Sequence, residues 1–263
     1  MEAELNSIGN RSVGRAAAIV ASVWLAGAGL GHAQEGADAD EQPDFSGVWR
    51  NYRGPSIGGG QRSLWPEDAP YTDEARRRIE EYQALVEGTG STPGGFCVGT
   101  GMPGSMLGSG GYPMEIIQRP EQVTIVYEAH NEIRRVYTDG REVDPRDLFP
   151  TRNGYSTGYW DGDTLIVETT ALKEAVDQRS PHSEDATIVE RYRLAGESDD
   201  GRRLLTAELT LTDPQFYEEP VTVTKTWVEA EEGTEMLTYE CTEPEWEEYL
   251  EQRREQVRTR ASG

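Results

Sequence analysis

His182 is the side chain in this sequence best suited to transferring a proton, because histidine has the unperturbed pKa closest to neutral pH. It stands in the segment SPHSEDA, followed by Glu184 and Asp185 and, on the next expected strand, by Glu190. A carboxylate beside the imidazole would tune it for general acid–base catalysis. The alternative is a loop histidine whose ring hydrogen bonds to the backbone. If the protein is an enzyme, we predict that His182 transfers the proton.

Three other side chains are alternatives for the same role: Tyr155, Tyr159 and Glu190. The sequence has no G-x-S-x-G segment to mark a serine nucleophile and no G-x-x-x-x-G-K-S/T segment to bind phosphates. We therefore expect any chemistry to proceed without a cofactor or a metal ion, as in a lyase, isomerase or hydratase that moves protons. His130, at an expected hairpin turn, is predicted to be solvated.

Two adjacent arginines, Arg134 and Arg135, lie on an expected strand, where successive side chains point to opposite faces. One of them therefore points inward, where an unpaired charge would be costly. It either forms an ion pair with a buried carboxylate such as Glu168 or Glu190, or binds an anionic group of a ligand. Aromatic side chains of neighbouring segments either line the same cavity or belong to the core. The predicted ligand contacts are Trp49, Tyr127, Arg134, Arg135, Tyr137 and Trp160.

The sequence contains two cysteines, Cys97 and Cys241. In an oxidising compartment such a pair usually forms a structural disulfide. Two separate buried thiols and a metal site are the alternatives. A zinc site needs about four ligands, and beyond the first 33 residues only His130 and His182 could add to the cysteines. We predict a disulfide between Cys97 and Cys241.

The chain is strongly acidic, since 25 Lys and Arg stand against 48 Asp and Glu among 263 residues and give a net charge of -23. A nucleic-acid-binding protein that neutralises phosphates needs a basic surface, and anionic lipids likewise attract basic segments. The composition therefore argues against a nucleic-acid partner and against docking on an anionic membrane. Lys173 and Lys225 are the only lysines, and all the other basic residues are arginines.

The first 33 residues have the pattern of a secretion signal. Arg11 and Arg15 precede the apolar run 16–30, and Gly31-His32-Ala33 supplies small residues for cleavage before Gln34. The apolar run is shorter than the roughly 20 residues that span a bilayer. We therefore predict a cleaved signal peptide (1–33) rather than a membrane anchor, no membrane insertion of the mature chain, and a periplasmic or secreted location.

The remaining chain divides by composition. Residues 34–44 are acidic without an apolar pattern and are predicted to be a disordered leader. Residues 45–242 are predicted to form one domain, with an amphipathic helix over 72–87 and a glycine-rich loop over 88–111. Apolar residues within that loop favour a packed loop over a flexible linker. Residues 243–263 are predicted to be a C-terminal helix and tail, with a capping box at Thr242.

Beyond residue 112 the sequence is a succession of short segments rich in β-branched and aromatic residues, separated by turn residues. Three expected hairpins join 156–160 with 164–170, 186–194 with 203–212, and 221–228 with 235–241. About ten strands in series without helices between them predict consecutive antiparallel hairpins. The expected fold is therefore mainly β, an antiparallel barrel with a sandwich as the alternative, and one helix near each end.

The opening FSGVW resembles the G-x-W strand of lipocalin-type barrels, with Gly47 and Trp49 in the matching positions. This resemblance implies a lipocalin-like barrel whose tryptophan closes the floor against an arginine. More of the chain, from Phe45 to Thr242, is similar to a family of exported bacterial proteins. This similarity implies no particular reaction. The similar stretches are SGVW, CVGTGMPGSM, PMEIIQ, RRVYTDGR, STGYWDGDTLIVET, PHSEDATIVERYR and YEC. That family has histidines where this chain has Tyr155 and Tyr159.

These observations support two functions. In the first, the exported barrel encloses a small hydrophobic or aromatic ligand and could perform cofactor-independent lyase, isomerase or hydratase chemistry. In the second, it is a non-catalytic ligand-binding or envelope-associated structural protein. The surroundings of His182 distinguish them, because a wet, aromatic-lined cavity favours catalysis and a closed, hydrogen-bonded site favours a structural role.

Overall fold

The computed structural model of the chain describes residues 42–54, 65–108 and 111–242, with isolated residues of the C-terminal segment (247, 249–252, 254 and 258). The predicted signal peptide (1–33), most of the leader (34–44) and most of the C-terminal helix (243–263) lie outside the described residues. Every described residue belongs to one compact unit, Ala37–Gly263.

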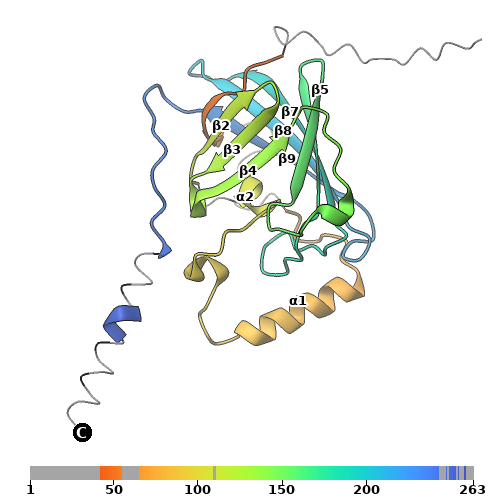
Figure 1. Cartoon of the computed structure of the whole chain (residues 1–263), viewed down its shortest axis with the longest axis vertical. Coiled ribbons are helices and arrows are strands. Elements are labelled where there is room, and N and C mark those ends of the chain that lie inside the picture. Colours follow the sequence, from red (N-terminus) through yellow and green to blue (C-terminus); the bar gives the residue numbers. More distant parts are fainter. Residues whose placement is uncertain are drawn as a thin grey trace, which may run out of the picture. The chain divides into compact units, whose positions relative to one another are not determined.

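In the described part of the chain the strands form one closed barrel (Figure 1). Each strand pairs with the next in sequence, and the last returns to pair with the first. The prediction of a mainly β barrel, rather than a sandwich, is confirmed. The strands are β1 (Gly47–Asn51), β2 (Met114–Arg119), β3 (Gln122–Tyr127), β4 (Glu132–Tyr137), β5 (Tyr155–Asp161), β6 (Thr164–Thr170), β7 (Thr187–Glu197), β8 (Arg203–Thr212) and β9 (Val221–Glu229).

The pairing of β4 with β5 departs from the predicted series of antiparallel hairpins. These two strands are parallel, with Val136 opposite Ser156 and Tyr137 opposite Thr157. A hairpin turn cannot join parallel strands. The residues between them, 138–154, accordingly form a longer connection that contains a short helix, η3 (Pro145–Asp147).

The last predicted hairpin is wrong, because residues 235–241 form no strand. β9 pairs with β8 on one side and with β1 on the other, where Trp49 lies opposite Glu229. Both edges of β9 are therefore occupied and a further strand cannot join it. Residues 235–241 lie instead beside the turn between β3 and β4, where the ring centroids of Tyr239 and His130 are 4.8 Å apart. His130 is thus half-buried in the short helix η2 (Ala129–Asn131) rather than solvated.

Period-2 alternation of apolar residues builds the core, because alternate side chains of each strand face the barrel interior. In β3, for example, Val123, Ile125 and Tyr127 are all buried. Where β1 begins, Trp49 is completely buried, and its indole N–H donates a hydrogen bond to the carbonyl of Phe45 at 2.9 Å. This end of the barrel is therefore filled by aromatic side chains.

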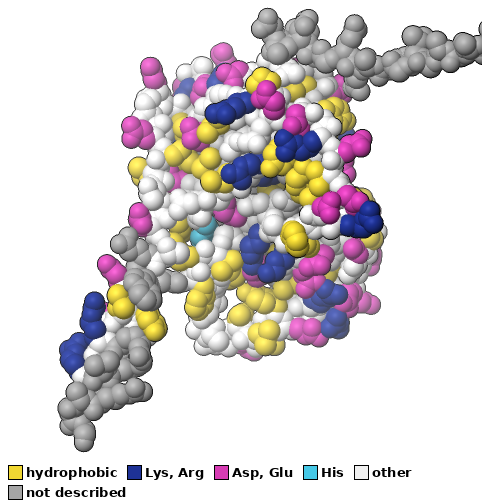
Figure 2. Space-filling view, viewed as in Figure 1, with side chains coloured by type: hydrophobic (Ala, Val, Ile, Leu, Met, Phe, Trp, Pro, Cys, Tyr) yellow, Lys and Arg dark blue, Asp and Glu magenta, His cyan; other side chains and the backbone are white. Residues whose placement is uncertain are grey.

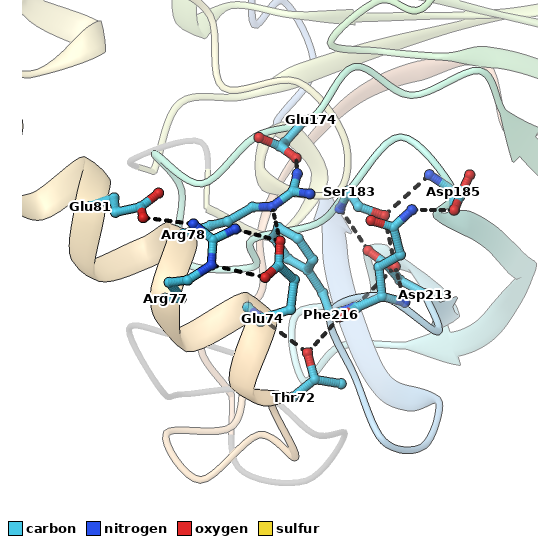
Figure 3. A network of polar contacts seen from close by, with 12 residues as sticks. Thr72, Glu74, Arg77, Arg78, Glu81, Glu174, Ser183, Asp185, Asp213 and Phe216 are labelled. Carbon is cyan, nitrogen blue, oxygen red and sulfur yellow. Dashed lines mark hydrogen bonds and ion pairs between the residues drawn. The ribbon is translucent and has the colours of Figure 1, made fainter.

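The predicted helix over 72–87 is α1 (Asp73–Val86). Thr72 caps its N-terminus, since the Thr72 hydroxyl accepts a hydrogen bond from the amide of Ala75. Figure 3 shows how α1 is attached to its neighbours. The Thr72 amide donates to the carbonyl of Phe216, and the guanidinium of Arg78 forms an ion pair with Glu174. A helix with few buried residues is thus held mainly by polar contacts at its first two turns.

The glycine-rich stretch 88–111 is packed only in part, since residues 101–107 are buried whereas residues 88–92 are exposed and Phe96 is 63% exposed. It contains two short helices, η1 (Pro93–Phe96) and α2 (Gly104–Gly108). Met102 and Met106 are buried in the core. The small residues permit this packing, because a side chain at Gly99 would lie 2.6 Å from the carboxylate of Glu132. Both Glu132 oxygens accept hydrogen bonds from this loop, one of them from the Gly101 amide at 2.9 Å.

The predicted disulfide is present. Cys97 and Cys241 are bonded, with their Cα atoms 5.6 Å apart, which excludes the alternatives of two free thiols and of a metal site for this pair. The bond joins the glycine-rich loop to the segment that follows β9. None of the helices among the described residues is long and apolar enough to cross a membrane.

Candidate functional site

A buried ion pair lies in the interior of the barrel. Arg134 of β4 points inward and its side chain is 1% exposed, while that of Glu190 on β7 is 0% exposed. One guanidinium nitrogen of Arg134 donates to Glu190 Oε1 at 2.9 Å, and the other donates to Glu190 Oε2. Of the two alternatives for the inward-pointing arginine, the ion pair with a buried carboxylate is present, and the arginine is Arg134.

Neighbouring hydroxyl groups complete the hydrogen bonding of this pair. The Arg134 guanidinium also donates to Ser156 Oγ at 3.1 Å and to Thr169 Oγ1 at 2.8 Å. The hydroxyl of Tyr192 donates to Glu190 Oε1 at 2.8 Å. Burial, followed by the charge of Glu190, raises the pKa of Tyr192 well above its usual value, so the phenol stays protonated. The carboxylate of Glu190 is therefore engaged with protein groups rather than directed at a substrate.

His182 lies in a closed environment outside the strands. It is 0% exposed, and its backbone pairs with that of Ala175 through two hydrogen bonds. Its ring nitrogen Nδ1 lies 3.3 Å from the backbone carbonyl oxygen of Ser180 and 3.5 Å from the side-chain nitrogen Nε2 of Gln178. The other ring nitrogen, Nε2, is buried without a hydrogen-bond partner among the described residues. The setting is therefore closed, as expected of a structural histidine, but the ring is hydrogen-bonded only at Nδ1.

The carboxylates that act on His182 are not those beside it in the sequence. Asp213 and Asp177 raise its pKa, but burial lowers it more strongly, so the net shift is downward. Asp213 itself accepts hydrogen bonds from the amide and the hydroxyl of Ser183, at 2.6 and 2.8 Å (Figure 3). The carboxylate with the larger effect on His182, Asp213, is thus already engaged with Ser183 of the same loop, and burial favours the neutral imidazole.

The downward pKa shift of His182 predicts a loss of stability in mild acid. Below the unfolded-state pKa near 6.5 the unfolded chain binds a proton that the folded protein excludes, so the free energy of unfolding falls as the pH falls. Between pH 7.5 and 5.5 we expect wild type to lose up to about 1.4 kcal/mol more than His182→Gln. Urea unfolding at the two pH values measures this difference, with His130→Gln as the control. Equal losses in wild type and His182→Gln would contradict it.

The four catalytic candidates are not brought together. Glu190 is inside the barrel and His182 is in the buried loop described above. Tyr155 and Tyr159 alternate with the inward-facing Ser156, so they lie on the outer face of β5, where Tyr159 is 58% exposed. The sequence pattern located each residue on its element but did not show which face of β5 is internal.

Two predicted ligand contacts also lie on the outer surface. Arg135 is exposed, and the guanidinium of Arg141 covers the ring of Tyr137 at 3.9 Å. Tyr137 also contacts the ring of Tyr155, with the centroids 5.4 Å apart. Hydrophobic and arginine side chains intermix over the face formed by β2 to β5 (Figure 2).

The other predicted contacts belong to the core. Tyr127 is buried beside Arg134, and burial raises the pKa of its phenol. Trp160 packs on Phe45, with ring centroids 5.1 Å apart. Trp49 lies beneath the guanidinium of Arg203, which is 5.3 Å from the ring centroid. Sequence reasoning missed Arg203, because this arginine is far from Trp49 in the sequence.

A pocket of about 350 Å³ lies outside the barrel wall. Its walls come from the ends of β1 and β3, from the residues before β2, and from the segment after β9. Leu237 of that segment is fixed there, since its amide donates to a carboxylate oxygen of Glu128 at 2.8 Å. The lining residues are Arg50, Gly111, Tyr112, Pro113, Glu128, Glu235 and Leu237. Sequence reasoning missed this pocket because it assigned residues 235–241 to a strand.

Among the residues that the structure describes, no three His, Cys, Asp or Glu side chains lie close enough to hold a metal ion.

No known protein family and no curated protein matches this chain. The interior polar groups hold one another, whereas the pocket combines an arginine, two carboxylates and apolar side chains in contact with solvent. Such a set can bind and orient a small molecule.

Proposed function

We propose that the protein is an exported, non-catalytic barrel that binds a small molecule in the pocket beneath the segment after β9. The observation that carries the proposal is the pocket itself, because its volume of about 350 Å³ falls within the range typical of small-molecule sites. Its lining also pairs apolar surface with a few charged groups, which is the usual composition of such sites.

The same pocket indicates the kind of ligand. Tyr112 and Leu237 offer an aromatic ring and an aliphatic side chain, and they are 43% and 69% exposed. Arg50 is an exposed cation on the pocket wall. A guanidinium binds carboxylates and similar anions with directed hydrogen bonds. The ligand that fits Arg50 and the apolar side chains is a small hydrophobic or aromatic molecule, and the two carboxylates of the lining, Glu128 and Glu235, restrict it to a single anionic group placed at Arg50.

A non-catalytic role is supported by the state of the candidate proton-transfer groups. Glu190 is paired with Arg134. His182 is buried, and this burial lowers the pKa of its imidazole. A general acid or base must reach the reacting atom within hydrogen-bonding distance. Neither group borders the pocket, so the hypothesis of a cofactor-independent lyase or isomerase has less support.

A lipocalin-like construction and export are parts of this proposal. Arg203 lies over Trp49 and donates to the backbone carbonyls of Asp44 and Ser46, which is the arrangement that the G-x-W resemblance implies. The parallel pair β4 and β5 departs from a simple up-and-down barrel. Export is supported by the disulfide, since such bonds persist in oxidising compartments.

Titration with indole-3-acetate, an aromatic carboxylate, tests the proposal. We expect saturable binding at one site, and we expect Arg50→Ala to weaken it at least about tenfold, the effect of losing one charge-assisted contact. Arg146→Ala is the matched control, because Arg146 is an exposed arginine distant in sequence from every pocket residue. Isothermal titration calorimetry measures the affinities. Equal weakening by the two variants, or no saturable binding, would overturn the proposal.

A further inference from the structure

Lys225 occupies an unusual position for a lysine. It lies on β9 between Val223 and Trp227, whose side chains are buried in the core, so its own side chain also starts toward the barrel interior. Across the neighbouring strands it aligns with Ala207 and then with Tyr192. A lysine therefore stands in a row of core positions.

Apolar and aromatic groups surround this amine. The Lys225 Nζ donates to the carbonyl oxygen of Leu107, the residue before the end of α2, at 3.5 Å. It lies 6.0 Å from the ring centroid of Trp227, and that ring stacks on Tyr192 with centroids 6.3 Å apart. Among the described residues no carboxylate forms an ion pair with Lys225, whereas the buried Arg134 has Glu190. The amine is thus half-buried without a counter-ion from the described part of the chain.

The environment makes this amine a better nucleophile than an ordinary lysine. Burial lowers the pKa of Lys225 to about 8. An ordinary lysine has a pKa near 10.4, so only about 0.1% of it is uncharged at pH 7.5. The uncharged fraction of Lys225 at that pH is about one quarter. A neutral amine in an apolar site is the form that attacks carbonyl compounds.

We propose that Lys225 is a covalent capture site for aldehydes that carry an aromatic or apolar body. The site is separate from the pocket that contains Arg50, and it does not depend on the function proposed for that pocket. The Lys225 amine adds to the aldehyde carbon to give a carbinolamine, which then loses water. The product is an imine, in which a C=N bond replaces the C=O bond and the carbonyl oxygen leaves as water.

The geometry supports both the reaction and the choice of aldehyde. The Leu107 carbonyl accepts a hydrogen bond from the amine and so fixes its direction. The Trp227 and Tyr192 rings are buried, so the body of the aldehyde is expected to lie over the partly exposed side of Lys225, where apolar surroundings favour an apolar body over a charged one. Since the imine forms reversibly in water, its persistence depends on such packing and on partial exclusion of solvent. A small, charged aldehyde gains neither advantage.

The chain supplies its own control, because Lys173 is its only other lysine and is exposed. Native protein is incubated with trans-cinnamaldehyde, and sodium cyanoborohydride reduces any imine to a stable amine. Digestion at glutamate and mass spectrometry then give the labelling rate of each lysine. We expect Lys225 to be labelled at least about tenfold faster than Lys173, and faster with cinnamaldehyde than with glyoxylate. In concentrated urea both lysines should react equally.

Two variants complete the test, Lys225→Arg and Lys173→Arg, which keep the charge and remove one amine each. We expect the fast adduct to disappear only in Lys225→Arg. The wild-type comparison does not depend on either variant folding. Native labelling of Lys225 no faster than that of Lys173, or a fast adduct that survives in Lys225→Arg, would overturn the proposal. Equal rates with glyoxylate would overturn the assignment of an apolar aldehyde.

Discussion

Replacing Arg134 by methionine should lower the free energy of unfolding by about 3 to 5 kcal/mol, the range for removing one partner of a buried ion pair. The side chains of Arg134 and Glu190 are 1% and 0% exposed, so water cannot take the place of the lost guanidinium. Among the described residues, the variant leaves the Glu190 carboxylate with the Tyr192 hydroxyl as its one hydrogen-bond donor. Urea unfolding followed by tryptophan fluorescence measures the change.

A double variant separates the charge from the packing. Arg134→Met combined with Glu190→Leu removes both charges, and buried pairs replaced by apolar residues are often neutral or stabilising. We therefore expect the double variant to recover part of the loss. Arg146→Met is the control for losing an arginine, because the ion pair of Arg146 with Asp144 is exposed and should contribute nothing measurable. A small loss in Arg134→Met, similar to that of Arg146→Met, would contradict a dry, buried pair.

Removing the disulfide should have an effect of similar size. Cys97 and Cys241 are 144 residues apart, and the chain-entropy model gives about 4 to 5 kcal/mol for closing a loop of that length. We expect Cys97→Ala/Cys241→Ala to fold, because the strand pairs of the barrel do not involve either cysteine. Its free energy of unfolding should fall by about this amount.

Reductant provides the internal control for this prediction. It should destabilise the wild type to the level of the double variant and leave the double variant unchanged. Binding of indole-3-acetate should weaken in both reduced wild type and variant, because Leu237 and Glu235 line the pocket on the segment that Cys241 anchors. Two free thiols in the folded wild-type protein, or a loss below about 1 kcal/mol, would contradict the prediction.

The barrel and the ion pair could be predicted because both follow from local periodicity. Alternation along β4 places Arg134 and Arg135 on opposite faces, and the cost of an unpaired internal charge requires a partner such as Glu190. The disulfide follows from having only two cysteines in a chain expected to be exported. The predicted boundaries of α1 differ from the observed ones by one residue at each end, because Thr72 and Gly88 mark the ends of the apolar pattern.

The features that could not be predicted depend on contacts between distant segments, which the periodicity of the sequence does not encode. The parallel pairing of β4 with β5 cannot be distinguished from a hairpin by the residues of either strand. Residues 235–241 alternate like a strand, but β1 already occupies the edge of β9 that they would need. Likewise, the groups that act on His182, Asp213 and Asp177, come from loops that only the fold brings near. The pocket was missed because it forms between two such segments.

The closure of the barrel by its first and last strands has a consequence for how the chain folds. β2 to β9 can each pair with the strand made before it, so β1 gains β2 as a partner early, whereas the other edge of β1 must wait for β9. The pairing of Trp49 with Glu229 therefore belongs to the late part of the reaction, since contacts between distant residues carry the largest loop-closure entropy. Before that step one edge of β1 and the outer edge of β9 are unpaired and open to other chains. The interval before closure is thus when aggregation would compete most with folding.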